Sequence, residues 1–298
     1  MRLSIIIPVL NSHEVLRRQL LYYAQMGIPS DTELIIVDDG SDPALALTVF
    51  AGHGLQVSFT DGAWCGPSAN GQIRVRLLET HDRRPWTWAL ARNAGARIAR
   101  GEYLLMYDID HIVPKYAIDF IRKTDAIKVQ FVREFGVLDE EGKLTQERSV
   151  LEAYGLPKDV SLAHGPLPNN FAMRRDVFWE LGGYREDLVE KPYPQGEDRA
   201  FRSAWRTYEN QRGGEGSQVC IHRPKIYHFP NGKYVGDVDA DPKKLFHNLS
   251  RKTERNWFHK NPGKSARHRL KATGLGISGP GTIEGVTVEG NKLKSNGS

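Results

Sequence analysis

An unbroken apolar run that ends in two carboxylates constrains this chain more than any other stretch. Residues 103–107 are apolar at every position and follow Gly101 and one glutamate. A run this short and this uniformly apolar predicts a strand that is buried on both faces. Asp108 and Asp110 follow it, and the alternation of an extended chain would turn both side chains the same way. The sequence thus predicts two neighbouring carboxylates at the carboxyl end of a buried strand, where open α/β sheets bind ligands.

Two interpretations of this Asp-x-Asp pair are open. Paired hard oxygen ligands suit Mg²⁺ or Mn²⁺, which makes the pair a candidate metal site. The same spacing is also common in surface loops that bind nothing. The apolar strand before the pair favours a metal, because carboxylates held close to a core need a cation or hydrogen-bond donors to offset their desolvation.

The segments around this strand alternate between two hydrophobic patterns. Short, largely apolar runs, which predict strands, lie at 3–7, 33–37, 103–107 and 128–132. Residues 73–78, where arginine alternates with apolar residues, predict another strand. Apolar residues at helical spacing, or helix start signals, predict helices at 14–26, 87–100 and 115–123. Strands that alternate with helices build right-handed βαβ units. The predicted fold class is therefore α/β, with a mostly parallel sheet flanked by helices.

Other parts of the chain are less regular. Residues 52–71 are rich in glycine and predict a long loop or insertion, and residues 134–168 show no assignable pattern. The remaining expected elements are a strand at 171–173, a helix at 176–181, a helix after Gly196 and a strand at 226–229. Residues 283–292 are expected to form either a small hairpin or a tail.

The composition excludes several classes of protein. The chain has 298 residues, of which 40% are hydrophobic and 26% charged, as in a soluble globular protein. No apolar stretch approaches the roughly 20 residues of a membrane span. Pro8 interrupts the first apolar run too early for a signal peptide, so a cytoplasmic location is expected. Cys65 and Cys220 alone provide neither a disulfide framework nor a four-ligand zinc site.

Seven short motifs, taken together and in order, resemble those of family 2 glycosyltransferases and their relatives with the GT-A fold. They lie at 7–11, 37–42, 91–95, 101–103, 108–110, 182–184 and 196–198. The resemblance implies a Rossmann-like glycosyltransferase domain at 1–250 and a C-terminal, acceptor-side extension. Within that domain it implies a nucleotide-sugar half at 1–132 and an acceptor and catalytic-base half at 133–250. Residues 251–298 would form a basic segment and a glycine-rich tail.

The resemblance also implies roles for individual residues. On the nucleotide side, Asp38 or Asp39 would hydrogen-bond the base, usually uracil, and the other residues there would be Pro8, Val9, Asn11, Arg92 and Asp108. Asp108 and Asp110 would hold the Mg²⁺ or Mn²⁺ that bridges the donor diphosphate. His228 matches a further metal ligand of some relatives, although a lone histidine is more often a packed or surface residue.

The implied reaction moves a sugar from a nucleotide-sugar to an acceptor hydroxyl. Asp198, with Glu197 as the alternative, would deprotonate that hydroxyl, and a single carboxylate opposite the leaving group implies inversion. The default acceptor is a saccharide or glycoconjugate. Residues 251–271 hold eight Lys or Arg and a single Glu, more positive charge than the +5 of the whole chain. That segment suits a polyanion, so DNA with hydroxymethylated pyrimidines, the substrate of phage-type enzymes, is an alternative.

Two other classes of protein are weighed against this one. A sugar-phosphate nucleotidyltransferase normally opens with a glycine-rich phosphate loop, and residues 8–13 contain no glycine. A non-catalytic sugar-binding module would not need Asp108, Asp110 and Asp198 together. The chain also has no Gln-x-x-Arg-Trp motif, which argues against a processive polysaccharide synthase.

Overall fold

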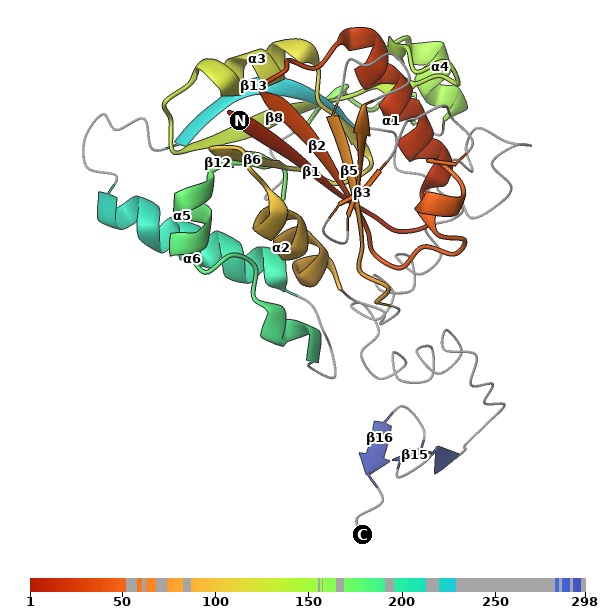
Figure 1. Cartoon of the computed structure of the whole chain (residues 1–298), viewed down its shortest axis with the longest axis vertical. Coiled ribbons are helices and arrows are strands. Elements are labelled where there is room, and N and C mark those ends of the chain that lie inside the picture. The colour runs from red at the N-terminus through yellow and green to blue at the C-terminus, as the bar shows by residue number, and fades with distance from the viewer. Residues whose placement is uncertain are drawn as a thin grey trace.

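A mixed β-sheet with helices on both faces forms the body of the protein (Figure 1). The computed structural model describes residues 1–51, 58–60, 63–67, 74–82, 87–154, 156, 158–164, 169–190, 196–212, 220–228, 282–283, 286–289 and 292–295. Within these ranges, no helix combines the length and the apolar character that crossing a membrane requires.

The strands of the central sheet lie in the order β3-β4-β5-β2-β1-β6-β12-β8-β13-β7, and β11 also pairs with β8. Their bounds are β1 (Leu3–Val9), β2 (Thr32–Asp38), β3 (Ser58–Thr60), β4 (Ala63–Pro67), β5 (Arg74–Glu79), β6 (Tyr103–Met106), β7 (His111–Ile112), β8 (Lys128–Phe135), β11 (Ala163–His164), β12 (Phe171–Arg174) and β13 (Cys220–His228). Two short strands form a separate pair, β9 (Val137–Leu138) and β10 (Leu144–Thr145).

The α-helices are α1 (His13–Met26), α2 (Trp88–Ile98), α3 (Lys115–Lys123), α4 (Arg148–Ala153), α5 (Arg175–Glu180) and α6 (Glu197–Arg212). Two 3₁₀ helices, η1 (Leu45–Leu47) and η2 (Glu186–Glu190), complete the set. Near the C-terminus, β14 (Thr282–Ile283), β15 (Val286–Glu289) and β16 (Lys292–Ser295) form an antiparallel sheet, which agrees with the hairpin interpretation of this region.

The longest strand pairings are parallel, which confirms the predicted α/β class and mostly parallel sheet. β1 lies between β2 and β6 and runs parallel to both, β5 runs parallel to β2, and β13 runs parallel to β8. β12 enters antiparallel between β6 and β8 and joins the first strands to the later ones. Parallel neighbours end at the same edge of a sheet, so the residues that follow β1, β2 and β6 come close together.

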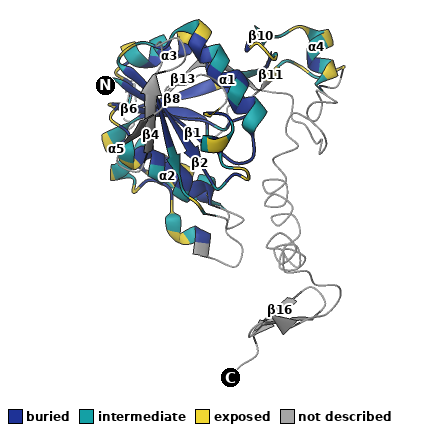
Figure 2. Cartoon of the chain, turned by 45° about the vertical axis from the view of Figure 1, so that its right-hand side comes forward, coloured by how far each residue is buried: buried dark blue, intermediate teal, exposed yellow. Residues whose placement is uncertain are grey.

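The alternation of side chains along β1 divides the core into two layers. Ile5 and Ile7 pack on the side that α1 and α3 cover, whereas Ile6 packs on the side of α2, α5 and α6. Both layers are buried, so the strands in the centre of the sheet are dark blue in Figure 2. The uniformly apolar runs in the sequence follow from this arrangement, because a strand between two helical layers exposes neither face.

Helix α2 approaches the sheet closely at Gly95. A Cβ atom added there would lie 2.6 Å from Cγ2 of Ile6 and 3.0 Å from Cγ2 of Val37. We expect Gly95→Ala to lower the free energy of unfolding by about 1–3 kcal/mol, as overpacking does in other cores. Chemical denaturation would measure this. In a double-mutant cycle with Ile6→Ala, the two losses should be less than additive, and full additivity would show that the two sites do not clash.

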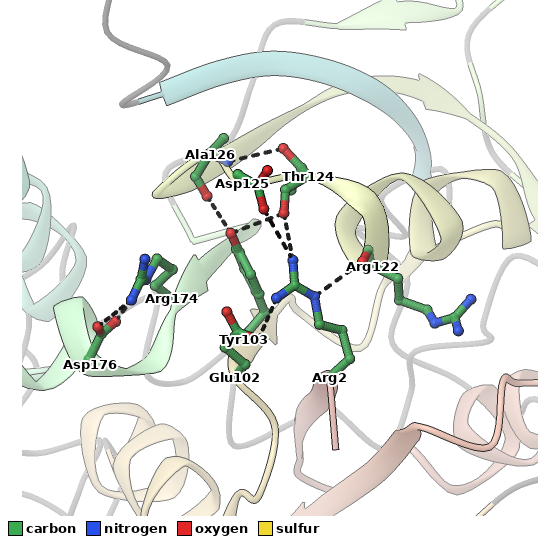
Figure 3. A network of polar contacts seen from close by, with 9 residues as sticks. All are labelled: Arg2, Glu102, Tyr103, Arg122, Thr124, Asp125, Ala126, Arg174 and Asp176. Atoms are coloured by element: carbon green, nitrogen blue, oxygen red, sulfur yellow. Dashed lines mark hydrogen bonds and ion pairs between the residues drawn. The ribbon is translucent and has the colours of Figure 1, made fainter.

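A polar network anchors the sheet at the amino-terminal ends of β1 and β6, opposite the carboxyl ends where ligands bind (Figure 3). Arg2 pairs with Glu102, donates hydrogen bonds to the carbonyls of Arg122 (3.1 Å) and Thr124 (2.7 Å), and stacks over the ring of Tyr103. The hydroxyl of Tyr103 donates to the carbonyl of Ala126 at 2.8 Å. These contacts fix the start of β1 and β6 against the end of α3 and leave the other ends of the strands to the functional site.

The structure adds elements where the sequence pattern was weak. The region 52–71, expected as a loop or insertion, contains β3 and β4, which extend the sheet antiparallel from β5. The unassigned region 134–168 contains β9, β10, α4 and β11. The basic segment 251–271 lies outside the described residues.

Candidate active site

The predicted nucleotide residues lie at the carboxyl edge of β1, β2 and β6. Pro8 and Val9 are buried at the end of β1, beside Val37 and Asp38 of β2. Asn11 has a positive φ of 49°, and its side-chain oxygen accepts the backbone N–H of Asp42 at 2.7 Å. The Asn11 N–H donates to the hydroxyl of Ser41 at 2.9 Å. The loops after β1 and β2 are therefore locked together.

The two consecutive aspartates after β2 have different contacts. Both carboxylate oxygens of Asp38 accept backbone N–H groups, from Ser41 and Leu45, each at 2.8 Å. Asp38 therefore shapes the loop that follows β2. The carboxylate of Asp39 is fully buried and accepts the hydroxyl proton of Thr87, the residue just before α2. The Thr87 hydroxyl oxygen lies 2.7 Å from each carboxylate oxygen of Asp39. Asp39 thus joins the end of β2 to the start of α2.

Arg92 of α2 is buried, and its guanidinium pairs with the carboxylate of Asp108. It lies over the rings of Trp88 and Tyr184, 5.4 and 5.3 Å from their centres. Burial alone would lower the pKa of Arg92, but the charges of Asp108 and Glu197 and the hydrogen bond to Asp108 raise the pKa above the usual value. Arg92 is therefore a permanent buried cation that fixes one oxygen of Asp108.

Asp108, Asp110 and His111 form a cluster that could hold a metal ion. One ligand atom from each lies within 4.8 Å of the others. The Nδ1 atom of His111 is 2.7 Å from a carboxylate oxygen of Asp110. The chain turns here, because the N–H of His111 donates to the carbonyl of Asp108 at 2.9 Å. A turn, rather than the alternation of an extended strand, therefore brings the ligands together, and it adds His111, which the sequence analysis did not select.

A second arginine lies beside this cluster. Arg133 of β8 is half-buried, with Nη1 3.5 Å from Nε2 of His111. Burial lowers the pKa of Arg133 below the usual value, although the charges of Asp110 and Asp108 oppose this effect. His228, the predicted further ligand, lies opposite His111 in the pairing of β13 with β7, so its backbone is next to the cluster. Its role as a ligand stays a prediction.

The candidate catalytic carboxylates begin helix α6. Glu197 is buried, whereas Asp198 is partly exposed, and an oxygen of Asp198 accepts the N–H of Arg199 at 2.8 Å. Burial raises the pKa of Tyr184; the charge of Arg92 opposes the rise, and the charges of Asp108, Glu197 and Asp198 add to it. Tyr184 thus lies within electrostatic reach of both the metal candidates and the start of α6.

Two of the sequence motifs bind each other directly. Asn93 donates its side-chain N–H to the carbonyl of Tyr184 at 2.7 Å and accepts the Tyr184 backbone N–H at 3.0 Å. Gly183 has a positive φ of 64°, and a Cβ atom added there would lie 2.9 Å from the Asn93 side-chain oxygen. This contact seats Tyr184 over Arg92.

Open α/β sheets bind ligands at the carboxyl ends of their strands, and this sheet has its acidic cluster and the buried Arg92 at that edge. The sequence model described as glycosyl transferase family 2 matches residues 4–182, which is more than half of the chain. The chain therefore belongs to glycosyl transferase family 2. This result argues against the nucleotidyltransferase and the non-catalytic module.

No curated protein matches the chain. Similar solved structures include TarS of S. aureus, residues 1–349, with 16% identity and a TM-score of 0.48 over 91% of this chain and 81% of that one. The same fragment in complex with UDP has 18% identity and a TM-score of 0.46. That match covers 70% of this chain and 56% of the TarS fragment. The mannosyltransferase PcManGT of Pyrobaculum calidifontis, in complex with GDP-Man and Mn²⁺, has 17% identity and a TM-score of 0.45. That match covers 93% of this chain and 76% of PcManGT.

Proposed function

We propose that this enzyme transfers a sugar, with inversion, from a UDP-linked donor to an acceptor hydroxyl, and that the reaction requires Mn²⁺ or Mg²⁺. The observation that carries the proposal is the cluster of Asp108, Asp110 and His111 beside the end of β1. The default acceptor remains a saccharide or glycoconjugate. Modified DNA remains the alternative, based on the charge of residues 251–271 in the sequence.

The nucleotide would bind over the ends of β1 and β2. Pro8, Val9 and Asn11 would line this side of the pocket. Asp38 or Asp39 would hydrogen-bond the base, because both follow the end of β2. A carboxylate oxygen can accept more than one hydrogen bond, so the contact of Asp39 with Thr87 is compatible with this role.

The donor set fits a hard or borderline divalent cation. Asp108 and Asp110 would provide oxygen ligands, and His111 or His228 an imidazole, which shifts the preference from Mg²⁺ towards Mn²⁺. The bound cation would supply the positive charge that stabilises the leaving diphosphate. Arg92 would keep the Asp108 carboxylate oriented, and Arg133 would add a second positive charge on the same side.

Asp198 is the proposed general base. It is partly exposed at the first turn of α6, whereas Glu197 is buried near Arg92. An accessible carboxylate can reach an acceptor hydroxyl, and a buried one within electrostatic reach of a cation suits a supporting role. As Asp198 takes the proton, the acceptor oxygen would bond to the anomeric carbon on the face opposite the diphosphate, and the bond from that carbon to the diphosphate would break. This single displacement inverts the anomeric carbon.

The direct test is a panel of nucleotide-sugars incubated with the purified enzyme and Mn²⁺, and read by mass spectrometry. We expect release of a nucleoside diphosphate from at least one UDP-sugar, and a gain of sugar mass on a saccharide acceptor. Hydroxymethylated DNA belongs in the same panel as the alternative acceptor. Turnover of GDP-sugars alone would overturn the choice of uracil, and undiminished turnover in excess EDTA would overturn the need for a metal.

A further inference from the structure

One buried side chain of α1 holds the turn that carries the metal candidates. Gln19 is buried, and its side-chain Nε2 donates to the backbone carbonyls of Ile109 at 2.6 Å and His111 at 2.8 Å. These two residues flank Asp110. A single amide group from a distant part of the chain therefore fixes the backbone on both sides of the central carboxylate.

The orientation of the Gln19 amide follows from its partners. Backbone carbonyls only accept hydrogen bonds, so the NH₂ group must face Ile109 and His111. The Gln19 oxygen then accepts the hydroxyl proton of Tyr107 at 3.1 Å. Tyr107 and Tyr23 are buried, and each phenol has one proton to donate. Because Tyr107 donates to Gln19, Tyr23 donates to Tyr107 in their mutual hydrogen bond.

The network therefore has one consistent direction, and it ends on the turn. Flipping the Gln19 amide would point its oxygen at two carbonyls and its NH₂ at a hydroxyl whose proton already faces it. Without Gln19, the carbonyls of Ile109 and His111 would lose buried partners, which is costly in an apolar interior. The turn would then have to change shape to find other donors.

We propose that Gln19 is a positioning residue, which acts on metal binding by holding the turn 108–111 in the shape that brings Asp108, Asp110 and His111 together. The inference rests on the metal role proposed above. The neighbouring buried residues of α1, Val15, Leu16 and Leu20, pack in the core with apolar side chains. A glutamine among them loses hydration, and its hydrogen bonds to the turn and to Tyr107 compensate for that loss.

The test measures Mn²⁺ binding to the full chain by electron paramagnetic resonance of the free ion, with and without UDP. Gln19→Leu keeps the volume and removes both donors, whereas Gln19→Glu turns a carboxyl group towards two carbonyls. We expect either change to weaken Mn²⁺ binding about 10- to 100-fold, the usual effect of losing a residue that orients metal ligands. If Gln19→Leu does not fold, the Mn²⁺ affinity of Gln19→Glu tests the positioning role on its own.

Tyr23→Phe is the matched control. It removes a hydroxyl from the same buried network, but the Tyr23 hydroxyl contacts the hydroxyl of Tyr107, which precedes the turn 108–111. We expect lower stability with Mn²⁺ affinity within about twofold of wild type. Unchanged affinity in the Gln19 variants, or an equal loss in Tyr23→Phe, would overturn the positioning role. If wild type itself binds no Mn²⁺ with or without UDP, the proposed metal role fails, and the role of Gln19 fails with it.

Discussion

Asp110→Asn is expected to reduce turnover by about 10³-fold or more, because a bound metal contributes several kcal/mol of charge stabilisation and each 1.4 kcal/mol is a factor of ten. The substitution keeps the shape of the side chain and removes the charge that a divalent cation requires. It should weaken Mn²⁺ binding as well, whereas the overall fold should persist because Asp110 lies at the edge of the sheet.

The matched control is Asp125→Asn. Asp125 is also an aspartate between β6 and β8, but it is almost fully exposed and lies with Arg2 at the amino-terminal edge (Figure 3). Its loss should leave turnover and Mn²⁺ affinity unchanged. Initial rates and Mn²⁺ titrations of the two variants would separate loss of a ligand from a general loss of negative charge. Wild-type rates for Asp110→Asn would contradict the metal site.

Asp198→Asn is expected to lower kcat by at least about 100-fold, the usual contribution of a general base, with little change in donor binding. The reason is that proton transfer belongs to the transition state, so its loss affects the rate and leaves ground-state binding intact. Steady-state kinetics, together with the dissociation constant of UDP, would measure both quantities.

Glu197→Gln tests whether the carboxylate next to Asp198 is the general base instead. Glu197 is buried within electrostatic reach of Arg92, so the change should lower the stability of the fold more than Asp198→Asn does. We expect the Glu197→Gln enzyme that remains folded to keep more turnover than Asp198→Asn. An inactive, stable Glu197→Gln beside an active Asp198→Asn would mean that the two roles are exchanged.

The sequence predicted the central strands because their environment leaves a strong pattern. β1, β2 and β6 lie between two helical layers, so most of their residues are apolar. β7 and β11 each have two residues and form only because a longer strand lies beside them, β13 and β8 respectively. No local pattern marks such strands, and β3 and β4 at the sheet edge were missed for the same reason.

The candidate site shows the same division. Asp108 and Asp110 could be selected because they follow a buried strand. His111 was missed because alternation puts adjacent side chains on opposite sides, whereas the turn at 108–111 brings it back to the carboxylates. Gln19 could not have been found from the sequence, because its contacts with Ile109 and His111 join residues about ninety positions apart.

The most direct test of the metal and nucleotide site is a crystal structure of the full chain with UDP and Mn²⁺, with the cation located by anomalous scattering. We expect one strong peak between the Asp110 carboxylate and the diphosphate of UDP, with the uracil ring hydrogen-bonded to Asp38 or Asp39. A manganese peak away from Asp108 and Asp110, or UDP bound at another edge of the sheet, would contradict it.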